Sequence, residues 1–146
     1  MVPDTDLRVT SLNATWRLAR RLADAHPRGG VLALQGPIGC GETTMVQGIA
    51  AALGVREPVT SPTFALVNTY AAGTLRLVHM DLYRLASPDE LWTLDFDAYL
   101  EAPDTLVAIE WPERAAGWLP PHTRKITILP GPRPTHRRIR ISPPLP

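Results

Sequence analysis

The sequence predicts an α/β fold of three layers, in which helices cover both faces of a mostly parallel central sheet and antiparallel hairpin strands extend it. Three observations support this prediction. A short apolar run at 31–35 leads through a glycine-rich turn into a helical pattern, the order expected of a buried strand and a helix. A second buried run lies at 106–109. Two segments that alternate apolar and polar residues flank Gly73, as hairpin strands do.

The N-terminal third of the chain predicts a helix, a strand and a second helix. Ser11 is the expected N-cap of the first helix, 12–25, in which four apolar residues fall at helical spacing: Leu12, Trp16, Ala19 and Ala23. The strand at 31–35 follows, and the loop after it opens the second helix. That helix carries Met45, Ile49, Ala52 and Leu53 on one side, and Gly54 is expected to end it.

The remaining elements follow from alternation, capping and turn residues. The hairpin is predicted at 65–70 and 75–80, with Ala72-Gly73 as its turn. Residues 87–90 cap a helix that turns Leu91 and Leu94 inward. We expect 125–129 and 138–141 to be edge strands around a Pro-Gly-Pro turn.

Length and composition favour an ordinary globular domain. The 146 residues are expected to form a single domain, 1–146, with a 45% hydrophobic share and a net charge of +1. This modest charge argues against strong independent binding of nucleic acid. The only cysteine is Cys40, so no internal disulfide framework is possible, and no apolar run is long enough to span a membrane. We therefore expect a cytoplasmic protein.

Residues 36–44 resemble a phosphate-binding loop, with GxxxxG followed by Glu42 where the motif has lysine and then by the expected Thr43. Glycines allow the loop's N–H groups to point at an anion, and the positive end of the next helix adds to the attraction. The position between strand and helix predicts a P-loop NTPase-like fold. The predicted nucleotide-binding residues of the loop are Gly36, Pro37, Ile38, Gly39, Cys40, Gly41, Glu42, Thr43 and Thr44.

Glu42 opposes the charge of the expected ligand. In such loops the lysine lies along the β- and γ-phosphates, and its replacement by glutamate changes the local charge by two units. Each unit at ~4 Å is of order 4 kcal/mol at an effective dielectric constant of ~20. The chain's one lysine, Lys125, lies far from the loop in the sequence.

Three further groups complete a candidate site for phosphoryl transfer. Thr43 would offer its hydroxyl to magnesium. Glu110, at the carboxyl end of a buried strand, would contribute a carboxylate directly or through water. Asp81 is a candidate for polarising an attacking water, and Thr63 for sensing the γ-phosphate. The alternative for Asp81 and Glu110 is a helix cap or a solvated strand end.

Other polar residues have a structural interpretation that we favour. His79 could act as a base, but a lone histidine in a strand is more often a hydrogen-bonded structural residue. Arg137, Arg138 and Arg140 could grip phosphate or RNA, although charges on an edge strand also prevent aggregation between sheets.

Four segments together resemble the TsaE family: GPIGCGETT, VTSPTFALVNTY, HMDLYRL and IEWPERA, in this order from about residue 11 to the C-terminal strands. The resemblance implies a small bacterial P-loop ATPase that requires ATP and Mg²⁺. Members of the family work with TsaB and TsaD to make threonylcarbamoyladenosine at position 37 of tRNAs that decode ANN codons. The resemblance thus implies a TsaB–TsaD complex as partner, and tRNA only indirectly through that complex.

The resemblance also implies roles for single residues. The loop glycines with Thr43 and Thr44 correspond to the nucleotide-binding loop, and Thr43 with Glu110 to the magnesium pair. Asp81 matches the family's catalytic or nucleotide-sensing acid, and Thr63 lies in its switch-like segment. Ser11 and Thr15 match a stretch near the nucleotide base. The sequence departs from the family's G-D-L-G-A-G-K-T at Pro37, which replaces Asp, and at Glu42, which replaces Lys.

Three hypotheses about function follow. The chain is an ATPase partner in tRNA modification whose hydrolysis Glu42 weakens, or it is an interaction module of the same complex that does not hydrolyse ATP. In the third, Glu42 is an introduced change in a competent ATPase, since Lys and Glu codons can differ by one base.

Overall fold

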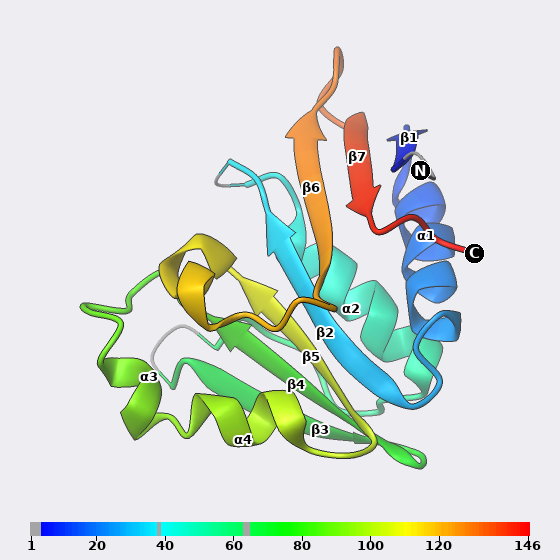
Figure 1. The fold of residues 1–146 in the computed structure, drawn as a ribbon. Coiled ribbons are helices and arrows are strands. Elements are labelled where there is room, and N and C mark those ends of the chain that lie inside the picture. Colours follow the sequence, from blue (N-terminus) through cyan, green and yellow to red (C-terminus); the bar gives the residue numbers. More distant parts are fainter. Residues whose placement is uncertain (1–3, 38, 63–64) are drawn as a thin grey trace.

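The computed structural model describes residues 4–37, 39–62 and 65–146, which form one mixed sheet with helices on both faces (Figure 1). The sheet has seven strands among these residues, in the order β1-β7-β6-β2-β5-β4-β3. In chain order the elements are β1 (Thr5–Val9), α1 (Leu12–Asp24), β2 (Gly29–Gln35), α2 (Glu42–Leu53), β3 (Val67–Ala72), β4 (Leu75–Asp81), α3 (Glu90–Thr93), α4 (Phe96–Glu101), β5 (Thr105–Glu110), the 3₁₀ helix η1 (Pro112–Trp118), β6 (Arg124–Pro130) and β7 (Arg137–Ser142).

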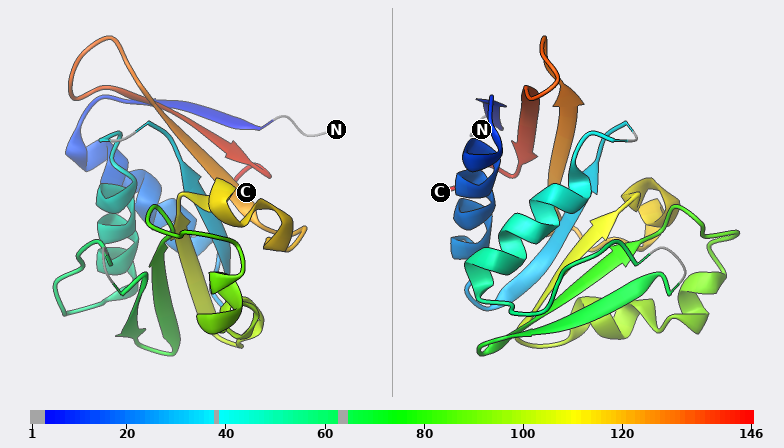
Figure 2. Two further views of the ribbon diagram at one scale, coloured as in Figure 1. Left: turned by 90° about the vertical axis from the view of Figure 1, so that its left-hand side faces the viewer. Right: turned by 180° about the vertical axis from the view of Figure 1, so that it is seen from behind.

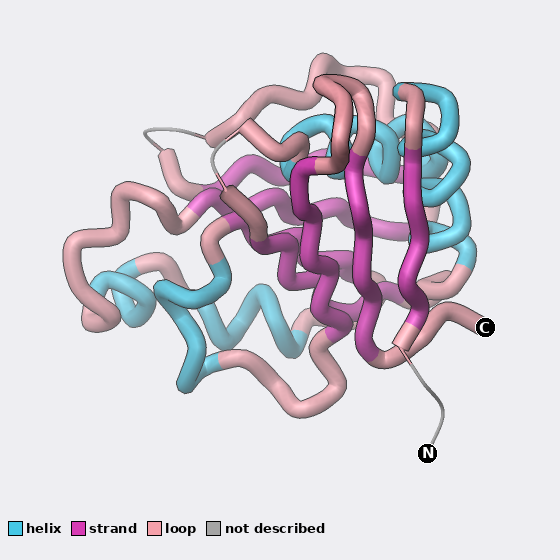
Figure 3. Tube along the Cα trace, turned by 90° about the horizontal axis from the view of Figure 1, so that it is seen from above, coloured by secondary structure: helices cyan, strands magenta, loops and turns pink. Residues whose placement is uncertain are grey.

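The centre of the sheet is parallel and both of its sides are antiparallel. Strands β6, β2, β5 and β4 run side by side in the same direction. Hairpins add β7 to β6 and β3 to β4, and β1 pairs with β7. Seen from above, the strands lie next to one another (Figure 3, magenta). This arrangement confirms the predicted α/β fold with a parallel centre and antiparallel hairpins.

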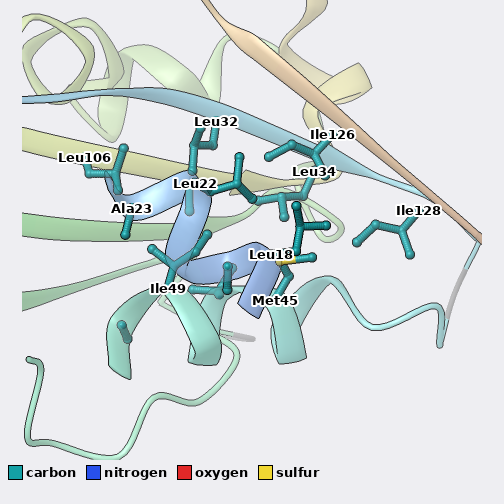
Figure 4. Close-up of a cluster of buried hydrophobic side chains, with 14 of the residues drawn as sticks. Leu18, Leu22, Ala23, Leu32, Leu34, Met45, Ile49, Leu106, Ile126 and Ile128 are labelled. Carbon is teal, nitrogen blue, oxygen red and sulfur yellow. The ribbon is translucent and has the colours of Figure 1, made fainter. Parts of the chain in front are cut away.

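Two apolar clusters hold the helices to the sheet. Helices α1 and α2 cover one face of the sheet, and α3, α4 and η1 lie on the other. The right-hand view of Figure 2 turns the face with α1 and α2 toward the reader. Leu22 of α1 and Ile49 of α2 pack with Leu32 of β2 in the first cluster (Figure 4). All three side chains are fully buried. The three-layer prediction is therefore correct.

The ends of the two long helices agree with the sequence. Ser11 caps α1, since its Oγ accepts a hydrogen bond from the N–H of Ala14 at 3.1 Å. Gly54 ends α2 in the left-handed region, with φ of 88°, where a side chain would be strained. Within the described ranges, no helix is long and apolar enough to cross a membrane.

The prediction that β6 and β7 are edge strands is wrong. The segment β1, which the sequence prediction omitted, pairs with β7 on its outer side, so the described edges of the sheet are β1 and β3. The arginines of β7 therefore do not protect a sheet edge. The helix predicted after residue 90 is only four residues long, and α4 follows it as a separate helix.

Candidate functional site

The glycine-rich loop lies at the carboxyl end of β2, where the chain turns into α2. Gly39 and Gly41 have φ of 82° and 100°, values that L side chains adopt only with strain. Gly36 is required for a different reason, since a Cβ there would lie 2.2 Å from the carbonyl oxygen of Ile128 on β6. The loop is thus shaped by glycine at three positions and opens onto the N-terminus of a twelve-residue helix.

Thr43, on the first turn of α2, meets Glu110 at the end of β5. Its Oγ1 lies 3.0 Å from each carboxylate oxygen of Glu110. Parallel register explains the encounter, because Glu110 lies opposite Leu34 of β2 and Asp81 of β4. Three strands therefore end together beside the loop. The structure thus brings together the two residues that the sequence predicts as magnesium ligands.

His79 supports Glu110 from the neighbouring strand. Its ring is fully buried, and Nε2 forms a hydrogen bond with Oε2 of Glu110. His79 and Asp81 lie two residues apart on β4, so both side chains face the side of the sheet on which Glu110 lies. His79 is therefore not only the structural residue that the sequence predicts, since it lies beside the site. Its two-residue spacing from Asp81 is the sequence signal for this position.

Asp81 is held on both carboxylate oxygens. Ser61 donates its hydroxyl to Oδ2 at 2.9 Å, and the N–H of Tyr83 donates to Oδ1 at 3.0 Å. The second bond is a local turn contact and not a helix cap, since the next helix begins only at Glu90. The first ties the segment before β3 to the end of β4. Ser61 was not singled out from the sequence.

Glu42 directs a half-buried carboxyl group into this acidic region. Its Oε1 is buried and has no hydrogen-bond partner in the described part of the chain. Burial raises the pKa of Glu42, and the nearby carboxylates of Glu110, Asp81 and Glu113 raise it further. Four acidic side chains thus lie near the position where the motif places a cation.

The residues of the site fit the magnesium ion of a magnesium nucleotide better than they fit its phosphates. A hydroxyl and a carboxylate are oxygen ligands of the kind that Mg²⁺ accepts, with water and phosphate completing its shell. Thr43 and Glu110 fit this role, although the described ranges contain no group of three or more His, Cys, Asp or Glu side chains that could hold a metal ion. The loop's backbone suits an anion, whereas the Glu42 carboxylate does not.

A cavity of about 190 Å³ adjoins the loop on the side of α1. Ser11 and Thr15 line it from the start of α1, and Gly41 and Thr44 line it from the loop and α2. The structure therefore places Ser11 and Thr15, the two residues predicted to lie near the nucleotide base, beside the loop.

Arg137, which the sequence analysis interpreted as an edge charge, also lines this cavity. Its Nε donates to the carbonyl oxygen of Cys40 at 2.9 Å. Two predicted site residues, Ile38 and Thr63, lie outside the described residues.

Comparisons with known proteins give one consistent result. A family model described as "Threonylcarbamoyl adenosine biosynthesis protein TsaE" matches residues 9–139. A Nostoc protein named tRNA threonylcarbamoyladenosine biosynthesis protein TsaE is 40% identical over 113 residues, covering 75% of this chain and 69% of its own length. A Treponema pallidum protein of the same name is 42% identical over 100 residues, covering 68% and 73%.

A solved structure is similar over nearly the whole fold. The crystal structure of Bacillus subtilus YdiB superposes with a TM-score of 0.77 and 30% sequence identity, over 97% of this chain and 86% of that one.

Proposed function

The chain belongs to the TsaE family, and we propose that it acts in tRNA threonylcarbamoyladenosine biosynthesis as a cytoplasmic, ATP-binding partner of a TsaB–TsaD complex. The contact between Thr43 and Glu110 is the observation that carries the nucleotide part of this proposal. It joins the first turn after a phosphate-type loop to a carboxylate at the end of the adjacent strand. The pathway follows from the names of the relatives.

Thr43 and Glu110 would hold magnesium, which when bound supplies positive charge beside the phosphate oxygens. The N–H groups of the loop would bind phosphate, and Ser11 and Thr15 would lie beside the nucleoside. His79 holds the carboxylate of Glu110 in place. Asp81, fixed through both of its oxygens, would orient the attacking water, and we assign Thr63 to the γ-phosphate.

Glu42 favours a second candidate function, an interaction module of the same complex that does not hydrolyse ATP. Glu42 has an unpartnered buried carboxylate oxygen and occupies the motif position whose lysine contacts the β- and γ-phosphates. Like charges repel strongly at a partly buried site. The two candidates differ in how tightly the chain binds magnesium-ATP.

Calorimetric titration with magnesium-ATP separates the two candidates. We expect Glu42→Lys to bind ATP at least about tenfold more tightly than the wild-type chain, with several kcal/mol as the upper range, because a facing carboxylate is replaced by a cation. Glu42→Gln is the matched control and should give an intermediate affinity, since it removes the negative charge and adds no positive one. Equal affinities of all three proteins would contradict the charge argument. Tight binding by the wild type would favour the ATPase over the interaction module.

The partner is tested separately by co-purification. The tagged chain should retain a recombinant TsaB–TsaD complex, and the comparison with and without magnesium-ATP shows whether nucleotide controls the association. Failure to retain the complex in both conditions would remove the partner from the proposal and leave the family assignment unchanged.

A further inference from the structure

Arg137 is fixed against the glycine-rich loop by three main-chain carbonyl groups. Besides Nε, which donates to Cys40, its Nη1 donates to the carbonyl oxygens of Pro134 and His136 at 2.7 Å each. Two of these carbonyls belong to the turn between β6 and β7, and the third belongs to the loop itself. Nη2 forms no hydrogen bond with the described part of the chain. The guanidinium is therefore held in place and retains donors for a ligand.

Arg137 and Glu42 lie on different sides of the loop and carry opposite charge. Among the described residues that line the cavity beside α1, Arg137 is the one that carries a charge. On the other side, Glu42 lies near the carboxylates of Glu110 and Asp81, which raise its pKa beyond the effect of burial. A ligand extended along the loop would meet a cation at its nucleoside end and anions at its far end.

The size of the cavity limits which part of a ligand it holds. At about 190 Å³ it is smaller than the roughly 300–1,000 Å³ of a pocket that encloses a drug-sized ligand. It suits a nucleoside portion, with the phosphates continuing over the loop. In loops of this kind the backbone N–H groups cradle the α- and β-phosphates, and the residue at position 42 faces the β- and γ-phosphates.

We propose that Arg137 anchors the nucleoside end and the first phosphates of the ligand, and that this site consequently prefers nucleoside diphosphates to triphosphates. This inference rests on the proposed nucleotide-binding function and adds a residue and a ligand preference to it. A guanidinium forms strong, directional hydrogen bonds with phosphate oxygens. The γ-phosphate brings the most negative charge toward Glu42, so its removal relieves the largest repulsion.

The test measures the dissociation constants of ADP and ATP, with magnesium, by calorimetry. We expect the wild-type chain to bind ADP several-fold more tightly than ATP, and Glu42→Lys to reverse this order. Arg137→Gln should weaken ADP binding about tenfold in both the wild-type and the Glu42→Lys backgrounds, and Arg137→Lys should recover part of the loss because it restores the charge without the fork of donors. Arg140→Gln removes the same charge from the same strand and is the matched control, since its side chain pairs with Asp6.

The outcomes distinguish this inference from the function on which it rests. Suppose that the Glu42→Lys protein binds nucleotide and that adding Arg137→Gln to it leaves the nucleotide affinity unchanged. The role of Arg137 is then refuted, while the nucleotide site stands. Tighter binding of ATP than of ADP by the wild type would overturn the diphosphate preference, and this comparison needs no Arg137 variant to fold. If neither the wild type nor Glu42→Lys binds any nucleotide, the proposed function fails and this inference fails with it.

Discussion

At the scale of single residues, Glu110 organises the site. The residue is buried at the end of β5, with 5% of its surface exposed. The hydroxyl of Thr43 and the ring of His79 both contact its carboxyl group. A buried carboxyl group without such partners would be costly, so the two neighbours stabilise Glu110 in its buried position.

Replacing His79 tests this support. We expect His79→Phe to lower the free energy of unfolding by about 1–3 kcal/mol, because the buried carboxyl group of Glu110 loses a hydrogen-bond partner. Urea denaturation of the two proteins measures the change. In a Glu110→Gln background the same substitution should lower the free energy of unfolding by less, since the charged partner of His79 is already absent. An equal loss in both backgrounds would show that His79 contributes through packing and not through Glu110.

How much of the site the sequence predicts depends on where each residue's partners lie. Thr43 is fixed by its place in a local motif, and Glu110 by its position at the end of a buried strand, so both were predictable. Arg137 and Cys40 are 97 residues apart, and Ser61 and Asp81 are 20 apart. Only the packing of β7 and of the segment before β3 brings these pairs together, and no local pattern encodes that packing.

At the scale of elements, α1 and α2 approach each other closely at Gly48. A Cβ at this position would lie 2.8 Å from the Cβ of Ala19 and 3.4 Å from the ring of Trp16. A glycine inside a helix lowers helical stability by about 1 kcal/mol relative to alanine. The close contact between the helices explains its presence, because a short Ala19 side chain cannot rotate away.

Gly48→Ala should therefore destabilise the protein, although alanine has a higher helix propensity than glycine. We expect a net loss of about 1–2 kcal/mol, since overpacking a tight interface outweighs the gain in propensity. Thermal denaturation of wild type and variant provides the measurement. Gly117→Ala is the matched control, because no atom lies within 4 Å of its added Cβ and its midpoint should hardly move. A Gly48→Ala protein more stable than the wild type would mean that α1 and α2 can move apart without a loss of stability.

Whether a strand could be predicted from the sequence likewise depends on where its pairing partner lies in the chain. The hairpin of β3 and β4, the strand β5 and both long helices were anticipated from alternation, buried runs and caps. Strand β1 was not, because its five residues pair only with β7, at the opposite end of the chain. Its Leu7 and Val9 do alternate with charged residues, but five residues of alternation are a weak signal without a neighbouring turn.

At the scale of the whole molecule, pH acts on stability through groups at opposite ends of β2. Glu42, beyond the carboxyl end of β2, has a raised pKa. As its folded-state pKa lies above its unfolded value, its unfavourable contribution grows as pH rises above the unfolded value. His26, beyond the other end, donates Nδ1–H to the carbonyl oxygen of Leu22 at 2.8 Å. Burial lowers the pKa of His26, and the charge of Arg124 lowers it further.

The contribution of His26 has the opposite sign and gives a prediction for the intact protein. Because its folded-state pKa lies below the unfolded value of about 6.5, the unfolded chain binds the proton more tightly, and stability is lost as pH falls below about 6.5 through the folded pKa. We expect the wild type to lose unfolding free energy relative to His26→Gln as pH falls, because only the wild type carries this imidazole. Urea denaturation of both proteins from about pH 7.5 to about pH 5 measures the difference. Glu42 is retained in both proteins and lies at the far end of β2, so its effect cancels in this difference. A difference that stays constant with pH would show that the imidazole of His26 titrates alike in the folded and unfolded chains.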